Sequence, residues 1–152
     1  MEFTKKDLNS TLWVKPTEMD ANRVWWKVDA TGKTLGRLAS DIAKKLLGKS
    51  KAYYCDFWDC GDYVVVENIQ NIQVTWAKSL QKLYYSYSGY KGNLKTITFR
   101  DLLKKDPERI LKEAVRGMLA KNKLRDQRMK RLKLIVGTTA QYDNFKPVTL
   151  YK

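Results

Sequence analysis

The pattern of apolar positions predicts one long amphipathic helix that begins near Thr34. Apolar residues recur there at three- and four-residue intervals, as expected when one face of a helix packs on a core; they are Leu35, Leu38, Ala39, Ile42, Ala43 and Leu46. Gly48 is a suitable end for this helix, because glycine readily adopts the backbone conformation of a helix C-cap. The positive charge at that end, where the helix dipole favours it, comes from Lys44, Lys45, Lys49 and Lys51.

Five shorter segments have the character of β-strands. Apolar runs occupy residues 24–29, 63–67, 72–76 and 132–136, the last followed by Gly137, and residues 82–88 are rich in tyrosine. A strand that is apolar along almost its whole length is typical of a parallel sheet that is covered on both faces. These runs therefore favour a small parallel sheet over an exposed antiparallel one.

Two further helices are predicted by their start signals. Thr98 and Asp101 have the spacing of a capping box, and Asp106 followed by Pro107 is a typical N-cap and first helical residue. Residues 1–22 and the tail after Gly137 have no periodicity. The alternation of strands and helices predicts a single α/β domain at residues 23–137, with an N-terminal extension at 1–22 and a C-terminal tail at 138–152.

Composition indicates a folded protein with an anionic partner. The 152 residues suit one domain, 43% are hydrophobic, and 30 basic residues against 16 acidic ones give a net charge of +14. Such a charge fits nucleic acid or an anionic membrane surface. The apolar runs are far shorter than the ~20 residues that span a bilayer, and the first residues lack the apolar region of a secretory signal. We therefore expect a cytoplasmic protein that binds nucleic acid and no membrane.

The segment at residues 116–133 carries half of the net charge. It holds eight basic residues and one acid, interleaved with leucine and methionine side chains that can anchor it to a core. This pattern is typical of a folded surface that binds the phosphate backbone. We expect Arg125, Arg128 and Arg131 to be exposed along one helical face. The predicted RNA contacts in this segment are Arg116, Lys121, Asn122, Lys123, Arg125, Arg128, Lys130 and Arg131.

A second basic segment, at residues 77–95, combines four lysines with four tyrosines and no acid. Tyrosines can stack on unpaired bases while lysines contact the backbone. The plainer alternative is that the tyrosines pack in the core. Because side chains alternate along a strand, we expect Tyr84 and the pair Tyr85 and Tyr87 to face opposite ways, one set buried. The predicted RNA contacts are Tyr87, Ser88, Gly89, Tyr90, Lys91 and Lys95.

Nucleotide hydrolysis is not supported by the turn at residues 32–34. The triplet Gly-Lys-Thr lies between a strand and a helix, as in a P-loop, but the earlier glycine of that motif is replaced by Lys27. The helix start can still bind one RNA phosphate through Lys33 and Arg37; the alternative is a solvated turn. The four lysines at the other end of the same helix are predicted RNA contacts as well.

No metal site or catalytic site is expected. Asp56, Asp59 and Asp62 could bind Mg²⁺, but carboxylates next to a glycine more often form caps and turns. The chain has no histidine, so neither a nucleophile–base pair nor a complete zinc site can be assembled from Cys55 and Cys60. We expect two reduced thiols, no cofactor and no small-molecule substrate.

Five separated motifs resemble the bacterial-type ribosomal protein L13 family of the large subunit. They lie in the family's order at residues 26–40 (WKVDATGKTLGRLAS), 59–66 (DCGDYVVV), 88–90 (SGY), 107–110 (PERI) and 114–119 (AVRGML), with Lys121, Asn122 and Leu124 continuing the last. The resemblance covers about residues 25–136. The chain departs from the family at Lys91, Gly92 and Asn93, at Ala120 and Arg125, and in the tail.

The resemblance implies a three-layer α/β/α domain with a small, mostly parallel sheet. It also implies a structural protein that binds large-subunit ribosomal RNA beside neighbouring ribosomal proteins and supports early subunit assembly and translation, without catalysis. The ribosome would be that of the cytoplasm or, alternatively, of an organelle. Two other functions stay open at this point: a free regulator that binds messenger RNA, and a nucleotide-processing enzyme that uses the turn at residues 32–34.

Overall fold

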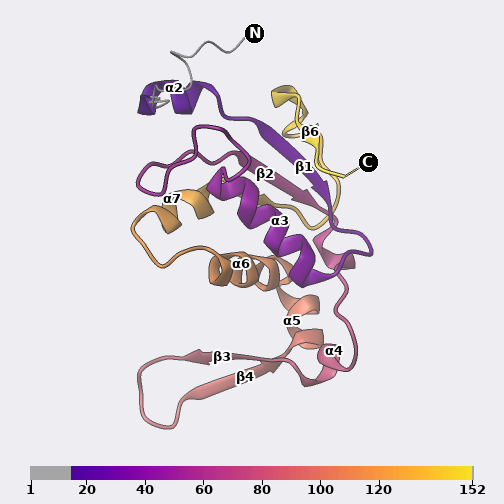
Figure 1. Cartoon of the computed structure of the whole chain (residues 1–152). Helices are drawn as coiled ribbons and strands as arrows, with labels where there is room; N and C mark the ends of the chain where they lie inside the picture. The colour runs from indigo at the N-terminus through magenta and orange to yellow at the C-terminus, as the bar shows by residue number, and fades with distance from the viewer. Residues whose placement is uncertain (1–14, 152) are drawn as a thin grey trace, which may run out of the picture.

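Four parallel strands form the central sheet, in the order β5-β2-β1-β6 (Figure 1). The structure is a computed structural model that describes residues 15–151; the prediction for residues 1–14 of the extension lies outside the described residues. The strands are β1 (Trp25–Asp29), β2 (Tyr63–Glu67), β5 (Leu132–Leu134) and β6 (Val148–Thr149). The prediction of a single α/β domain with a small, mostly parallel sheet is confirmed.

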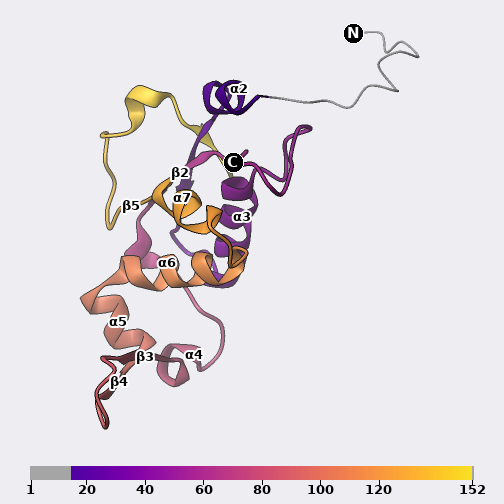
Figure 2. The same cartoon turned by 90° about the vertical axis from the view of Figure 1, so that its left-hand side faces the viewer.

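The two faces of this sheet are covered differently. Val28, Val64 and Val66 point into the core beneath helix α3 (Leu35–Leu47). The residues between them point the other way, where the C-terminal segment covers them: Lys27 forms an ion pair with Asp143, 3.2 Å away, in the short helix η2 (Asp143–Phe145). The tail therefore packs against the second face, and its strand β6 pairs with β1 (Figures 1 and 2).

The predicted helices form where their signals lie. Helix α3 buries all six of its predicted apolar positions and ends at Gly48, whose φ is +78°. Helix α5 (Phe99–Lys105) begins after Thr98, which accepts a hydrogen bond from the Asp101 amide at 3.2 Å. Helix α6 (Pro107–Met118) begins after Asp106, which caps it in the same way. Helices α6 and α7 (Leu124–Lys130) both contact α3.

A β-hairpin projects from the domain next to α5 (Figure 1). Strands β3 (Leu83–Tyr87) and β4 (Leu94–Thr98) pair antiparallel, and helix α4 (Lys78–Gln81) precedes them. Strand β3 confirms the predicted strand at 82–88, whereas β4 was not predicted, because its residues lack an apolar run.

The predicted strand at residues 72–76 is wrong. The segment follows the short helix η1 (Ile69–Asn71) and, within residues 15–151, makes only one isolated bridge, between Gln73 and Thr34. The places beside β1 and β2 are taken by β6 and β5, so this segment does not pair with either of the two central strands. Ile72 is buried in the core instead, and the chain turns away at Trp76, whose φ is +62°.

The end of the N-terminal extension packs on the domain. Helix α2 (Pro16–Ala21) buries Met19, whose sulfur lies 3.7 Å from the Cys60 thiol. The absence of periodicity at residues 1–22 gave no sign of this contact. Within residues 15–151, no helix is long and apolar enough to cross a membrane.

Candidate nucleic-acid interface

Eight of the predicted RNA-contacting cations are exposed and uncompensated. Within residues 15–151, none of them forms an ion pair, so each can bind a phosphate without breaking an ion pair in the protein. They are Arg37, Lys49, Lys91, Lys95, Arg116, Lys121, Lys123 and Lys130. They come from α3, from the hairpin, from the end of α6 and from the segment through α7. Surface cations without counter-charges are the groups that counterion release rewards most on RNA binding.

The hairpin combines such cations with exposed aromatic rings. Tyr85 and Tyr87 are each 60% exposed and Tyr90 is 77% exposed, whereas Tyr84 is buried. The expected alternation along this strand is therefore confirmed. At the tip, Gly89 and Gly92 adopt positive φ angles, and the Asn93 amide donates a 2.8 Å hydrogen bond to the Ser88 hydroxyl.

The prediction that three arginines line one exposed helical face is wrong. Arg128 is 1% exposed and Arg131 is 4% exposed, and Arg125 is half-buried. Arg131 donates two hydrogen bonds to the Asp59 carboxylate, one of them at 2.6 Å, and Arg128 donates a third at 3.4 Å. Arg131 also donates to the Leu46 carbonyl, 3.2 Å away, so its guanidinium connects α3 to the start of β5.

The neighbouring arginines stabilise the ionised form of Asp59. Burial raises the pKa of this carboxyl, but the hydrogen bond from Arg131 and the charges of Arg131, Arg23 and Arg128 outweigh burial and lower the pKa below its usual 3.8. Asp59 therefore acts as the counter-charge of a structural cluster of guanidinium groups.

Lys51, another predicted RNA contact, has a structural partner instead. It forms an ion pair with the buried Asp62, which in addition accepts hydrogen bonds from the Val24 amide at 3.1 Å and the Trp26 indole at 3.0 Å. Of the predicted Asp cluster, Asp59 and Asp62 therefore hold structural cations rather than a metal. Within the part of the chain that the structure describes, no group of three Cys, Asp or Glu side chains is arranged to bind a metal ion.

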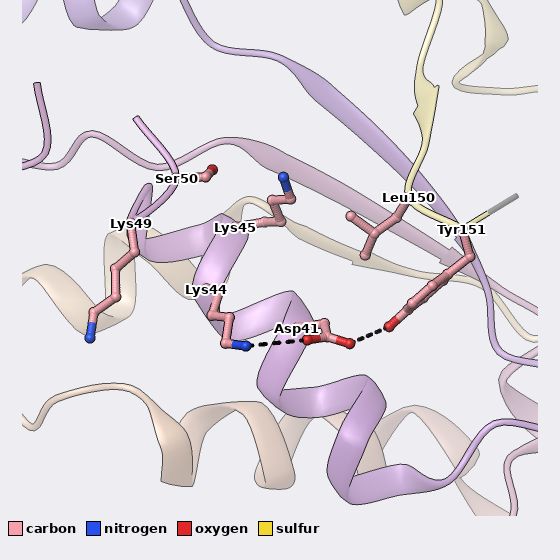
Figure 3. Close-up of a pocket in the computed structure, with 7 residues that line it drawn as sticks. All are labelled: Asp41, Lys44, Lys45, Lys49, Ser50, Leu150 and Tyr151. Atoms are coloured by element: carbon pink, nitrogen blue, oxygen red, sulfur yellow. Dashed lines mark hydrogen bonds and ion pairs between the residues drawn. The ribbon is translucent and has the colours of Figure 1, made fainter. Parts of the chain in front are cut away.

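Three predicted lysines on and before α3 have intramolecular partners near the C-terminal segment. The Lys33 ammonium lies 3.3 Å from the centre of the Tyr151 ring, and burial lowers the pKa of this lysine. Lys45 lies 3.7 Å from the centre of the Trp26 ring, and Lys44 lies 3.6 Å from Asp41. Figure 3 shows Lys44 and Tyr151 directed at Asp41, whereas Lys49 points away from them. All of these residues, with Lys45, line a cavity of about 420 Å³.

A larger cavity of about 720 Å³ is lined by residues of α3, α4 and α6. Arg37, Lys78 and Lys82 supply its charge, and none of the described residues that line it is acidic. Lys78 and Lys82 were noted as part of the basic segment but not predicted as contacts, because nothing in the sequence indicates that residues of α4 and α3 border one cavity. The nearby Trp76 is 92% exposed, and no sequence signal identifies it as a surface residue.

The predicted thiols and the predicted turn occupy ordinary structural positions. Cys55 and Cys60 are free thiols whose sulfurs lie 3.7 Å apart, and burial raises the pKa of Cys60. Lys27 stands where a P-loop needs glycine, and its ammonium lies 3.0 Å from Glu67. The backbone at residues 32–34 therefore forms a turn between β1 and α3 rather than a nucleotide cradle.

Comparison with known proteins gives one family and several relatives. The family model for ribosomal protein L13 matches residues 23–141. The large ribosomal subunit protein uL13 of Aquifex aeolicus is 48% identical over 140 residues, which cover 92% of this chain and 96% of that protein. The protein of the same name from Alkalilimnicola ehrlichii is 49% identical over 118 residues, 78% of this chain and 83% of that protein. The one from Psychromonas ingrahamii is 44% identical, with 92% and 97% covered.

Proposed function

The chain belongs to the ribosomal protein L13 family, and from this we propose that it is a structural constituent of the large ribosomal subunit that binds the RNA of that subunit. The observation that carries the proposal is the set of eight exposed cations without ion pairs within residues 15–151. Such a surface is typical of a protein whose positive charge is neutralised by a bound anionic polymer.

Two of the exposed basic surfaces suit different features of RNA. The hairpin offers Lys91 and Lys95 to the backbone and exposed tyrosines to unpaired bases, as proteins that recognise single-stranded RNA do. The α6–α7 connection offers Lys121 and Lys123, which suit the phosphates of a duplex. Arg128, Arg131 and Lys51 support these surfaces through the fold rather than by contact with RNA.

The role in the ribosome is structural. The domain has its own buried core, so its cations are in place before neighbouring proteins arrive, and we propose that it binds early in assembly of the large subunit. Its further partners are the adjacent ribosomal proteins, in a cytoplasmic ribosome of the bacterial type. No catalytic step is assigned to it.

Salt dependence of binding tests the proposal. Binding to a transcript of large-subunit ribosomal RNA is measured at several salt concentrations, with a small-subunit transcript as the comparison. Each lost phosphate contact reduces the log–log slope by roughly 0.7–0.9. The double variant Lys121→Ala/Lys123→Ala should therefore flatten the slope by about 1.4–1.8 while the melting temperature stays the same.

The matched control is Lys104→Ala/Lys105→Ala, which removes two exposed lysines from the end of α5, outside the proposed surfaces. Its slope should stay close to that of the unmodified chain. Equal binding to both transcripts, or equal slopes for the two double variants, would count against the proposal.

A further inference from the structure

Three aromatic rings form a stack across the sheet face that the C-terminal segment covers. The Trp25 ring lies between Tyr63, at a centroid distance of 4.3 Å and an angle of 6°, and Phe145, at 4.2 Å and 8°. Tyr63 is the register partner of Trp25 in the neighbouring strand β2, whereas Phe145 comes from η2 in the tail. Because β2 and the tail strand β6 flank β1 on opposite sides, the two rings cover opposite faces of Trp25.

The stack ends at Tyr63 on the side of strand β5. Trp25 covers the face of Tyr63 that points toward β1, so the other face points toward β5, the next strand of the sheet. A surface cavity of about 560 Å³ lies on that side, lined by Tyr63 together with Lys133 of β5 and Gln127 and Lys130 of α7. Helix α2 borders the same cavity through Asp20.

The cavity has uncompensated positive charge. Its two carboxylates already have partners, since Asp59 pairs with Arg131 and Asp20 lies 2.5 Å from Arg23. Within residues 15–151, Lys130 and Lys133 form no ion pair. An aromatic floor beside free cations is the combination that single-stranded nucleic acid requires, with a base on the ring and phosphates on the lysines.

We propose that this cavity holds one unpaired nucleobase of the bound RNA, stacked on Tyr63 as the fourth ring of the series, with the flanking phosphates on Lys130 and Lys133. The inference rests on the proposed function, because the base belongs to the RNA that the protein binds. The cavity volume lies within the roughly 300–1,000 Å³ of pockets that hold small-molecule ligands. The Gln127 amide can donate to and accept from the edge of a base.

The opposite end of the stack does not offer the same site. Phe145 is exposed, but none of the cavities described above is lined by it. A peptide of glutamates alone could satisfy the two lysines, but it has no ring to stack on Tyr63. Substitution of Tyr63 can therefore be compared with substitution of Phe145 at the other end of the same stack.

The test uses the full chain and three probes: a single-stranded RNA of five adenosines, a five-unit abasic ribose-phosphate oligomer, and pentaglutamate. The ring protons of Tyr63 are followed by NMR, because a base stacked on the ring shifts them upfield. We expect this shift with the adenosine pentamer and not with the abasic oligomer. This measurement needs no substitution, so it stands even if a variant fails to fold.

Variants then test the affinity. Tyr63→Leu should weaken binding of the adenosine pentamer about 5- to 150-fold, the equivalent of roughly 1–3 kcal/mol per stacked base at about 1.4 kcal/mol per tenfold change. Tyr63→Phe restores the ring and should restore the binding. Phe145→Leu removes one ring from the other end of the stack and should leave the binding within about twofold.

Four results would overturn the inference: no shift at Tyr63 when the pentamer binds, an equal shift with the abasic oligomer, an equal shift with pentaglutamate, or equal losses for Tyr63→Leu and Phe145→Leu. None of these affects the proposed function, which is decided separately by binding to the large-subunit transcript. If that transcript fails to bind, the proposed function fails instead.

Discussion

Replacement of Asp59 by asparagine should expose how strongly the fold depends on its buried guanidinium cluster. The carboxylate accepts hydrogen bonds from Arg131 and Arg128 and lies 4.0 Å from Arg23. The asparagine side chain would have nearly the same shape and no charge. Two guanidinium groups, on side chains that are 5% and 2% exposed, would then remain in the interior without a counter-charge.

The expected loss is large because only one partner is removed. Breaking a buried ion pair in this way costs about 3–5 kcal/mol, and the hydrogen-bonding capacity of asparagine favours the lower value. A loss of about 3 kcal/mol is a substantial part of the roughly 5–15 kcal/mol that stabilises a typical domain. At about 2–4 °C per kcal/mol for a chain of this size, the melting temperature should fall by roughly 6–12 °C.

The pH dependence of the free energy of unfolding shows whether the charge of Asp59 causes this loss. The pKa of Asp59 is lower in the folded chain than its usual 3.8, so the ionised carboxylate stabilises the fold above about pH 4. This contribution is lost as the pH falls through the folded pKa, because the protonated carboxyl is then as neutral as asparagine. The difference in free energy of unfolding between the two proteins should therefore be full at about pH 7 and shrink below about pH 4.

Urea unfolding followed by tryptophan fluorescence, at pH values from about 7 to about 2.5, measures this difference. Asp20→Asn is the control, since its carboxylate also pairs with Arg23 but is 66% exposed, and such a pair contributes about 0–1 kcal/mol. The reasoning is refuted if Asp59→Asn destabilises the chain no more than Asp20→Asn, or if its deficit is the same at every pH.

Two further substitutions test how α3 is held. Tyr151→Phe removes the 2.6 Å hydrogen bond to α3 and should lower the free energy of unfolding by about 1 kcal/mol, whereas Tyr90→Phe on the exposed hairpin tip should change it little; equal values in urea unfolding would contradict the contact. Gly61→Ala would force a methyl group into the Leu46 carbonyl and should cost about 3 kcal/mol. In Gly117→Ala the new methyl group would meet no atom within 4 Å, and the change should raise the free energy of unfolding by about 0.5–1 kcal/mol. Calorimetry should therefore show a lower melting temperature for Gly61→Ala and a higher one for Gly117→Ala than for the unmodified chain.

The sequence by itself determined the elements whose signals are local. The helix after Thr34 follows from apolar spacing within thirteen residues, and the caps at Thr98 and Asp106 follow from side chains three residues from the amides they bind. The family resemblance likewise rests on short runs that can be read along the chain. The alternation of tyrosines in β3 was predicted for the same reason, although only the structure shows that Tyr84 is the buried one.

Only the tertiary structure decided which cations face solvent. Arg128 and Arg131 have the spacing of an exposed helical row, but Asp59 lies 69 and 72 residues before them in the chain and draws them inward. The stack of Tyr63, Trp25 and Phe145 depends in the same way on strand order and on a tail without periodicity. The physical reason is that a charge or a ring takes its place from whichever partner the fold brings beside it, and sequence spacing carries no information about partners so far away along the chain.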